Sequence, residues 1–150
     1  IWQEYGEELY EARDYRTAEL AVRRALALQP GSVPAVLDLA LILRALGRTA
    51  EALAELDGPA GAGNLDALRA RALWLMEAGR GVEAAAAVEA LWRAAPGDPL
   101  GSYVEARLKL REGRRAQAQA FLRQAAASGA EAPFTARVSA ALAALLGGQR

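Results

Sequence analysis

Apolar residues recur along the chain at intervals of three and four residues, which is the pattern of helices that bury one face. At the start of the chain these positions are Trp2, Tyr5, Leu9, Ala18, Val22 and Ala25. The first three fall on one helical stripe and the last three on another. Pro30 ends the second stripe, because proline cannot continue a helix. The pattern therefore predicts two helices, over residues 1–12 and 15–28.

The same periodicity predicts further helices. They are expected at residues 34–46, 49–56, 65–78, 82–95, 100–112, 115–128 and 133–146. Favourable residues for a helix start stand before or at the beginning of several of them: Asp14, Asn64, Asp98 and Pro99. Alanine is abundant and β-branched residues are scarce, which favours helix. We therefore expect an all-α chain of about nine helices.

Two ladders of small residues repeat along this pattern. The alanines Ala18, Ala52, Ala84 and Ala118 are spaced by 34, 32 and 34 residues. The glycines Gly47, Gly79, Gly113 and Gly147 are spaced by 32, 34 and 34 residues. Glycine can take the left-handed conformation that ends a helix, and alanine lets antiparallel helices approach closely. Because both ladders share the same two-residue deletion, they predict an array of helix pairs.

The repeats are expected at about 1–32, 33–64, 65–98 and 99–132, with a terminal helix at 133–146, all within one domain over 1–150. In the first repeat Arg13 stands where the turn glycine would be. The deletion falls between Asp57 and Asn64, where glycine and proline are too dense for a regular helix. Two interpretations of this break stay open: a shortened helix followed by a loop, or a hinge between the two halves.

The first repeat carries a motif that resembles a known family. Its spacing is Trp2-x2-Tyr5-Gly6-x2-Leu9, then Ala18-x3-Val22, then Pro30. This resembles the tetratricopeptide repeat, W-x2-L-G-x2-Y, then A-x3-F, then P. The resemblance covers nearly the whole chain as about four and a half repeats, and the fourth departs most, with Glu105 and Lys109 at two motif positions. It implies a right-handed α-solenoid of antiparallel helix pairs that serves as a protein–protein interaction scaffold.

The composition disfavours several other classes of function. Basic and acidic residues balance at 18 each, with a pI near 6.6, which gives no support to a nucleic-acid binder. Histidine and cysteine are absent, and no phosphate-binding loop, nucleophile elbow or metal-ligand spacing occurs. We therefore expect no enzyme activity, no metal and no cofactor.

Signals for membrane insertion or export are also absent from the sequence. No apolar run reaches the length of about 18 residues that a transmembrane helix needs, and no signal peptide is visible. Since the chain begins inside a predicted helix, we expect a module of a larger protein. The expected location is the cytoplasm, or alternatively the periplasm or a membrane surface reached through other parts of that protein.

An acidic cluster lies on the first predicted helix, at Glu4, Glu7, Glu8 and Glu11. Paired carboxylates can perform acid–base chemistry, but a solvated face near a helix N-terminus is the preferred interpretation. The tryptophans Trp2, Trp74 and Trp92 are expected in the core rather than in a ligand site.

In tetratricopeptide proteins the first helix of each repeat lines a concave groove that holds a partner segment. Transferred position by position, the resemblance implies these groove residues: Glu7, Tyr10, Glu11, Leu37, Leu41, Arg44, Arg69, Leu73, Met76, Tyr103, Arg107, Leu110, Arg111 and Arg137. The set is acidic in the first repeat, apolar in the middle and basic at the end. We predict an amphipathic partner segment with acidic groups toward the last repeats, where arginine can bind carboxylates through two hydrogen bonds.

Alternatives to this groove stay open. The same side chains can be only the solvated face of a stable solenoid. Leucines of the first repeat and the terminal helix can instead stack copies of the chain, which would make a structural oligomer. An RNA reader of similar period is disfavoured by the neutral charge. The family's subgroup that clamps a terminal carboxylate with Lys and Asn is disfavoured because Glu7 replaces the Asn.

Overall fold

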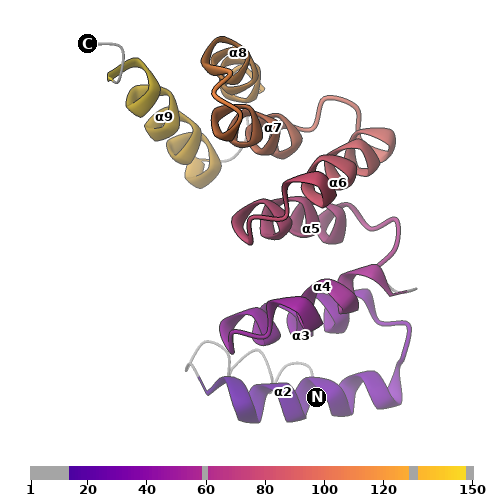
Figure 1. Ribbon diagram of the computed structural model, residues 1–150. Coiled ribbons are helices and arrows are strands. Elements are labelled where there is room, and N and C mark those ends of the chain that lie inside the picture. The colour runs from indigo at the N-terminus through magenta and orange to yellow at the C-terminus, as the bar shows by residue number, and fades with distance from the viewer. Residues whose placement is uncertain (1–13, 59–60, 129–131, 148–150) are drawn as a thin grey trace. The chain divides into compact units, whose positions relative to one another are not determined.

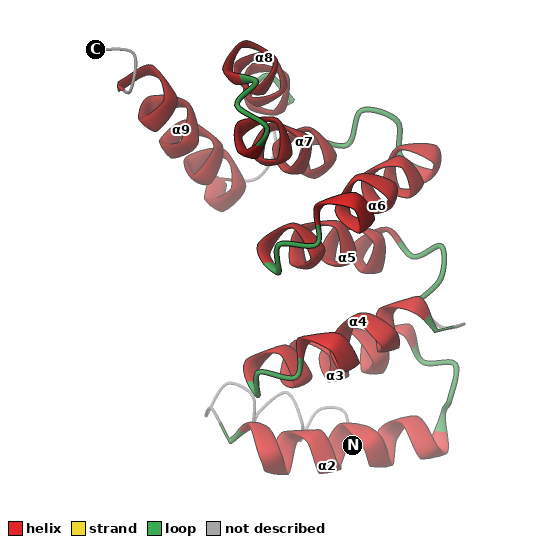
Figure 2. Cartoon of the chain, in the orientation of Figure 1, coloured by secondary structure: helices red, strands yellow, loops and turns green. Residues whose placement is uncertain are grey.

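The computed structural model describes residues 14–58, 61–128 and 132–147, with side chains of the last helix described from 137 to 144 (Figure 1). All regular structure in these ranges is helical, and they contain no strand (Figure 2). The helices are α2 (Tyr15–Leu28), α3 (Val33–Ala45), α4 (Thr49–Asp57), α5 (Leu65–Glu77), α6 (Gly81–Ala94), α7 (Pro99–Arg111), α8 (Arg115–Ala126) and α9 (Ala132–Gly147). The predicted all-α class is confirmed, while the predicted helix over 1–12 lies outside the described residues.

The helix starts use the capping residues that the sequence indicates. The Asp14 carboxylate accepts a hydrogen bond from the Thr17 N–H at 3.3 Å, and the Asn64 side chain accepts one from the Ala67 N–H at 3.1 Å. These bonds satisfy N–H groups that have no partner within the helix. Such local signals explain why every described helix end lies within two residues of its predicted position.

The turns inside the helix pairs confirm the glycine ladder at three of its four positions. Gly47, Gly79 and Gly113 have φ angles of 80°, 78° and 76°, the left-handed region that glycine adopts without strain. The fourth, Gly147, is the last residue of α9. A left-handed residue at each turn lets the chain reverse tightly into the next helix.

The repeated alanines form the centre of the packing. Ala18, Ala52, Ala84 and Ala118 are all fully buried, as their place between close antiparallel helices requires. Trp74 is also buried, as predicted, whereas Trp92 is half-buried and Trp2 lies outside the described residues. Small side chains therefore set the distance between helices, and larger apolar ones fill the space around them.

The break after α4 is a compact turn in its described part. α4 ends at Asp57, and the backbone N–H groups of Gly61 and Ala62 both bind the Gly58 carbonyl, at 3.1 and 3.0 Å. Gly61 is buried so closely against Leu56 that a Cβ there would lie 2.5 Å from the Leu56 carbonyl oxygen. The predicted shortening of the helix is confirmed, and the hinge interpretation stays untested.

The chain divides into two compact units, residues 1–68 and 69–150, called here the N-terminal and C-terminal units. In the N-terminal unit α3 packs against α2 and α4. In the C-terminal unit α7 packs against α6 and α8, and α8 packs against α9. The boundary falls within α5, between Leu68 and Arg69. The prediction that residues 1–150 form a single array stays a prediction.

Candidate functional site

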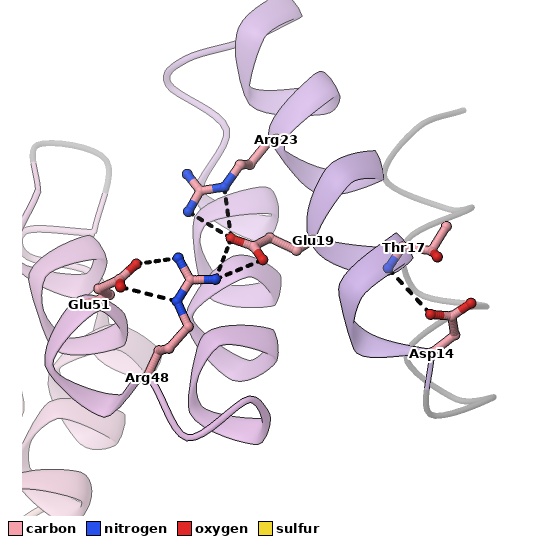
Figure 3. Close-up of polar contacts among 6 residues, drawn as sticks. All are labelled: Asp14, Thr17, Glu19, Arg23, Arg48 and Glu51. Atoms are coloured by element: carbon pink, nitrogen blue, oxygen red, sulfur yellow. Dashed lines mark hydrogen bonds and ion pairs between the residues drawn. The ribbon is translucent and has the colours of Figure 1, made fainter.

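Arg48 and Arg80, which directly follow the turn glycines Gly47 and Gly79, bind glutamates near the start of the next helix. Arg48 binds Glu51 through its Nε at 3.0 Å, and Arg80 binds Glu83 in the same way at 2.9 Å. These bonds lower the pKa of both carboxyls. Arg48 also reaches Glu19 of α2, with its Nη1 2.9 Å from each carboxylate oxygen (Figure 3). The charges of Arg48 and Arg80 are therefore paired with carboxylates of the same chain at its surface.

The predicted groove residues of the N-terminal unit divide by exposure. Glu7, Tyr10 and Glu11 lie outside the described residues. On α3, Leu41 is 40% exposed, whereas Leu37 and Arg44 are half-buried. The role of Leu41 in the apolar middle of the groove stays a prediction.

The predicted residues on α5 and at the start of α7 are mostly engaged inside the C-terminal unit. Met76 and Tyr103 are buried, at 3% and 7% exposure, and Leu73 is half-buried. Arg69 forms two hydrogen bonds with the buried Asp98 carboxylate, through Nε at 2.9 Å and Nη2 at 2.8 Å. Arg69 therefore ties α5 to the start of α7.

Arg111 and Met76 are brought together, although 35 residues separate them in the sequence. The Arg111 guanidinium lies 4.0 Å from the Met76 sulfur. Because thioether sulfur is a weak acceptor, this contact leaves the charge of Arg111 largely uncompensated. Arg107, one turn earlier on the same helix, is exposed and forms no ion pair with any described residue.

A cavity of about 390 Å³ lies beside Arg107 in the C-terminal unit. It is lined by Arg107, Leu110, Gly113, Arg115, Ala141 and Ala144. We call this set the arginine pocket. Its lining comes from α7, the turn after it, the start of α8 and the middle of α9. It combines two guanidinium groups with an apolar wall, and no acidic residue is among the described residues that line it.

The arginine pocket contains two of the predicted groove residues, Arg107 and Leu110, and one functional candidate that sequence reasoning missed. Arg115 begins α8, so the transfer from first helices alone does not reach it. The sequence feature that could have identified Arg115 is the pair of arginines, Arg114 and Arg115, directly after the turn glycine Gly113. Arg137 of α9 is exposed and is not among the residues that line this cavity.

Elsewhere on α7, a half-buried acidic residue adds a further electrostatic feature. Burial raises the pKa of the Glu105 carboxyl, while the charge of Lys109 opposes this shift. The Lys109 Nζ lies 3.6 Å from Oε2 of Glu112, and the Arg114 Nε lies 3.4 Å from the same oxygen. Glu112 is therefore paired with neighbouring bases, and neither Glu105 nor Glu112 is among the residues that line the arginine pocket.

The described ranges contain neither a candidate membrane span nor a candidate metal site. No helix there is long and apolar enough to cross a membrane. No group of three or more acidic residues there is arranged to hold a metal ion.

The solved structures with a similar fold include tetratricopeptide repeat proteins. MamA has a TM-score of 0.74 and 14% sequence identity over 96% of this chain and 84% of its own. A thermophilic tetratricopeptide protein of Thermus thermophilus has a TM-score of 0.70 and 22% identity, over 99% of this chain and 81% of its own. A tetratricopeptide repeat protein from Parabacteroides merdae has a TM-score of 0.73 and 19% identity, over 98% of this chain and 59% of its own.

These comparisons confirm the resemblance at the level of the fold: the chain has the tetratricopeptide solenoid fold. No protein-family model matches the sequence, and no curated protein matches it. Fold alone does not define a function, so the function must be argued from the surface of this chain.

Proposed function

We propose that the chain is a protein-binding scaffold and that the arginine pocket is part of its binding surface. The supporting observation is the placement of Arg107, Leu110 and Arg115 around one cavity in the C-terminal unit. Arg107 and Leu110 belong to the helix that corresponds to the first helix of a tetratricopeptide repeat. That helix is the one on which the resemblance predicts partner contacts.

The chemistry of the pocket favours a partner segment with an acidic side chain beside an apolar one. Guanidinium groups present a rigid set of N–H donors that matches the two oxygens of a carboxylate. Leu110, Ala141 and Ala144 offer apolar surface next to these donors. A carboxylate placed between Arg107 and Arg115 would leave room for its neighbouring apolar side chain against α9.

The bound segment is proposed to extend beyond the pocket. Arg111 is exposed on α7, one turn from Arg107, and offers a further site for acidic groups. The roles of Leu37, Leu41 and Arg44 of α3, in the N-terminal unit, stay predictions from the sequence.

The test is selection of peptide ligands from a random displayed library, followed by affinity measurements on the selected sequences. We expect the selected peptides to carry an acidic residue next to an apolar one. The double substitution Arg107→Glu and Arg111→Glu should weaken their binding at least tenfold, because two attractions become repulsions. Raising the salt concentration should also weaken binding to the wild type.

The matched control reverses two exposed arginines of the same unit that lie away from the pocket, Arg93→Glu and Arg123→Glu. This control makes the same change in net charge and should leave the affinity unchanged. Equal binding by both double variants would contradict the proposal. Failure to select any ligand would favour the alternative that this face is only solvated.

Self-association is the second candidate function. Leu20 and Leu28 on α2 are 68% and 72% exposed, which offers apolar surface for a second copy. Single exposed leucines are also ordinary on monomers, so this observation is weaker than the arginine pocket. Light scattering over a concentration series tests it: a constant monomer mass would remove this candidate.

A further inference from the structure

The corner where α6, α7 and α8 meet is filled by aromatic side chains. Trp92 of α6 stacks on Phe121 of α8, with ring centroids 6.4 Å apart. The Trp92 indole lies so close to α7 that a Cβ at Gly101 would be 2.5 Å from its Nε1. The chain's own side chains therefore occupy this corner of the C-terminal unit.

The equivalent corner of the N-terminal unit carries different residues at the same two places. These places can be counted from the buried alanines that repeat along the chain. Eight residues after the alanine, α6 has Trp92 and α2 has Leu26. Three residues after the alanine, α8 has Phe121 and α4 has Glu55. An aliphatic and an acidic side chain thus stand where the other corner has two rings.

This N-terminal corner contains a cavity between the ends of α2 and α4 and the start of α3 (Figure 1). Its volume is about 760 Å³, and it is lined by Leu26, Pro30, Gly31, Val33, Val36, Glu55 and Gly58. This volume lies within the range of about 300–1,000 Å³ that is typical of ligand pockets. α4 has 9 residues, whereas its counterpart α8 has 12, so α4 covers less of its corner. We call this space the corner cavity.

Glu55 supplies the charge in the described lining of the corner cavity, where its side chain is half-buried. Glu51, one turn earlier on α4, forms an ion pair with Arg48. By contrast, no hydrogen bond or ion pair joins the Glu55 carboxylate to another described residue. A carboxylate beside an apolar wall is stabilised by a cation that reaches it. The corner cavity therefore favours a ligand with an apolar part and a positive charge.

The packing of α3 favours a slender apolar part over a ring. Ala35 of α3 holds the place that Gly101 has in α7, since each is three residues after the residue that caps its helix. A ring that approached α3 as Trp92 approaches α7 would collide with the Ala35 methyl group. A flexible chain of methylene groups can instead follow the aliphatic side chains of the lining.

A lysine side chain has both properties. It joins a four-carbon stem to an ammonium group with three N–H donors, whereas the wider guanidinium of arginine has five. Because the described lining offers one carboxylate, an ammonium leaves fewer donors without an acceptor. A second copy of the chain is a poor source, since Lys109 is its only lysine and the Lys109 Nζ lies 3.6 Å from Oε2 of Glu112. The lysine must therefore come from another protein.

We propose that the corner cavity binds a lysine side chain of a partner protein. The stem of this lysine packs against Leu26, Val33 and Val36, and its ammonium pairs with the Glu55 carboxylate. The site lies on α2, α3 and α4 of the N-terminal unit and uses none of the residues of the arginine pocket. It therefore stands or falls separately from the binding surface proposed above.

The probe is acetyl-lysine-methylamide, which carries one lysine side chain between two peptide groups. It is added to the full chain and followed by NMR of methyl groups. We expect saturable shifts of the Leu26, Val33 and Val36 methyls, with a dissociation constant in the millimolar range that suits a ligand of this size. Absence of saturable shifts at these methyls would overturn the proposal.

Two related compounds test the chemistry of the ligand. Acetyl-norleucine-methylamide keeps the four-carbon stem but lacks the ammonium, so it should bind at least fivefold more weakly. Acetyl-arginine-methylamide should also bind more weakly, because its additional N–H donors would lose water without gaining acceptors. Equal binding of the norleucine compound would show that Glu55 does not recognise the charge. Tighter binding of the arginine compound would overturn the assignment to lysine.

Two substitutions locate the site on the chain. Glu55→Gln should weaken acetyl-lysine-methylamide at least fivefold, whereas Glu89→Gln, the same change at an exposed position of α6, should have no effect. Gly31→Phe should occupy part of the cavity and reduce binding, since a Cβ at Gly31 has no neighbour within 4 Å and its ring has room. Circular dichroism checks that each variant folds. Equal affinities of the Glu55→Gln and Glu89→Gln variants would overturn the proposal.

The arginine variant separates this site from the arginine pocket. The double substitution Arg107→Glu and Arg111→Glu should leave the shifts of the Leu26 and Val33 methyls unchanged, because those arginines lie in the other unit. A loss of these shifts in that variant would overturn the assignment to the corner cavity.

Discussion

Gly101 shows how a single position can be fixed by a distant side chain. A Cβ at this position would lie 2.5 Å from Nε1 and 2.9 Å from Cε2 of Trp92. Gly101 is not at a turn and lies inside α7, where glycine normally weakens a helix. The small size of Gly101 therefore lets the Trp92 indole pack closely against α7, and a larger residue would displace the indole.

We expect Gly101→Ala to destabilise the chain by about 1–3 kcal/mol, since the added methyl must push the indole or α7 aside. Gly31→Ala is the control, because a Cβ there has no neighbour within 4 Å. Urea unfolding of both variants measures the difference. Equal stability of the two variants would show that packing of the Trp92 indole against α7 does not require a glycine at position 101.

Glu105 gives a prediction for pH. Its folded pKa is raised, chiefly by burial, so the folded chain binds this proton more tightly than the unfolded chain does. The contribution of Glu105 to stability therefore falls as the pH rises from the ordinary glutamate pKa through the raised folded value.

Glu105→Gln should accordingly raise stability at neutral pH, by less than about 1 kcal/mol because the site is partly solvated. The gain should disappear in acid, where Glu105 of the wild type is protonated. Thermal unfolding of both proteins between neutral and acidic pH provides the measurement. A gain that persists unchanged in acid would show that the charge is not its cause.

Residues whose role is set by a local rule could be predicted from the sequence, and residues set by distant contacts could not. The turn glycines and the buried alanines follow from helix ends and close helix packing, and the structure confirms them. By contrast, Arg69 was assigned to the groove, but its partner Asp98 lies 29 residues away. No periodicity in the sequence reveals such a pair.

Helices are the scale at which the sequence was most informative. The pattern of apolar residues and the caps placed the described helix ends within two residues. The glycine and proline cluster after Leu56 predicted the early end of α4. What the pattern could not provide is the cavity at the corner of α2, α3 and α4, because it depends on which side chains face each other across three helices.

The start of α7 depends on one buried carboxylate with two tasks. Asp98 Oδ1 accepts a hydrogen bond from the Leu100 N–H at 3.0 Å and so caps the helix. Asp98 Oδ2 accepts the two hydrogen bonds from Arg69 of α5. One side chain thus fixes both the beginning of a helix and its attachment to a neighbour.

We expect Asp98→Ala to cost about 2–4 kcal/mol, since it removes a cap and a charge-assisted pair together. Asp98→Asn keeps an acceptor for the cap and loses the negative charge, so it should cost roughly half as much. Chemical unfolding of both variants, each measured alone and in combination with Arg69→Met, separates the contribution of the helix cap from that of the ion pair with Arg69. If Asp98→Asn costs the same with and without Arg69, the pair with Arg69 contributes nothing.

At the scale of the whole molecule, zero net charge conceals an uneven distribution of charge. Glu112, in the turn after α7, pairs with Lys109 and Arg114, and the two arginines Arg107 and Arg115 line a common cavity. The sequence predicted the basic character of this region and two of its residues. It could not show that Met76 and Tyr103 turn into the core, because the helical period alone does not determine which flank of a helix its neighbours cover.

The bond between Arg48 and Glu19 has a consequence for local opening. The amides of Arg48, Arg80 and Arg114 occupy the same place after their turn glycines, and each binds a carbonyl of the preceding helix at 2.8–3.0 Å. Only the first of these turns, among the described residues, is also fastened to an earlier helix by its own side chain. Native-state hydrogen exchange should therefore find the Arg48 amide the slowest of the three, and Glu19→Gln should bring its rate to that of the others.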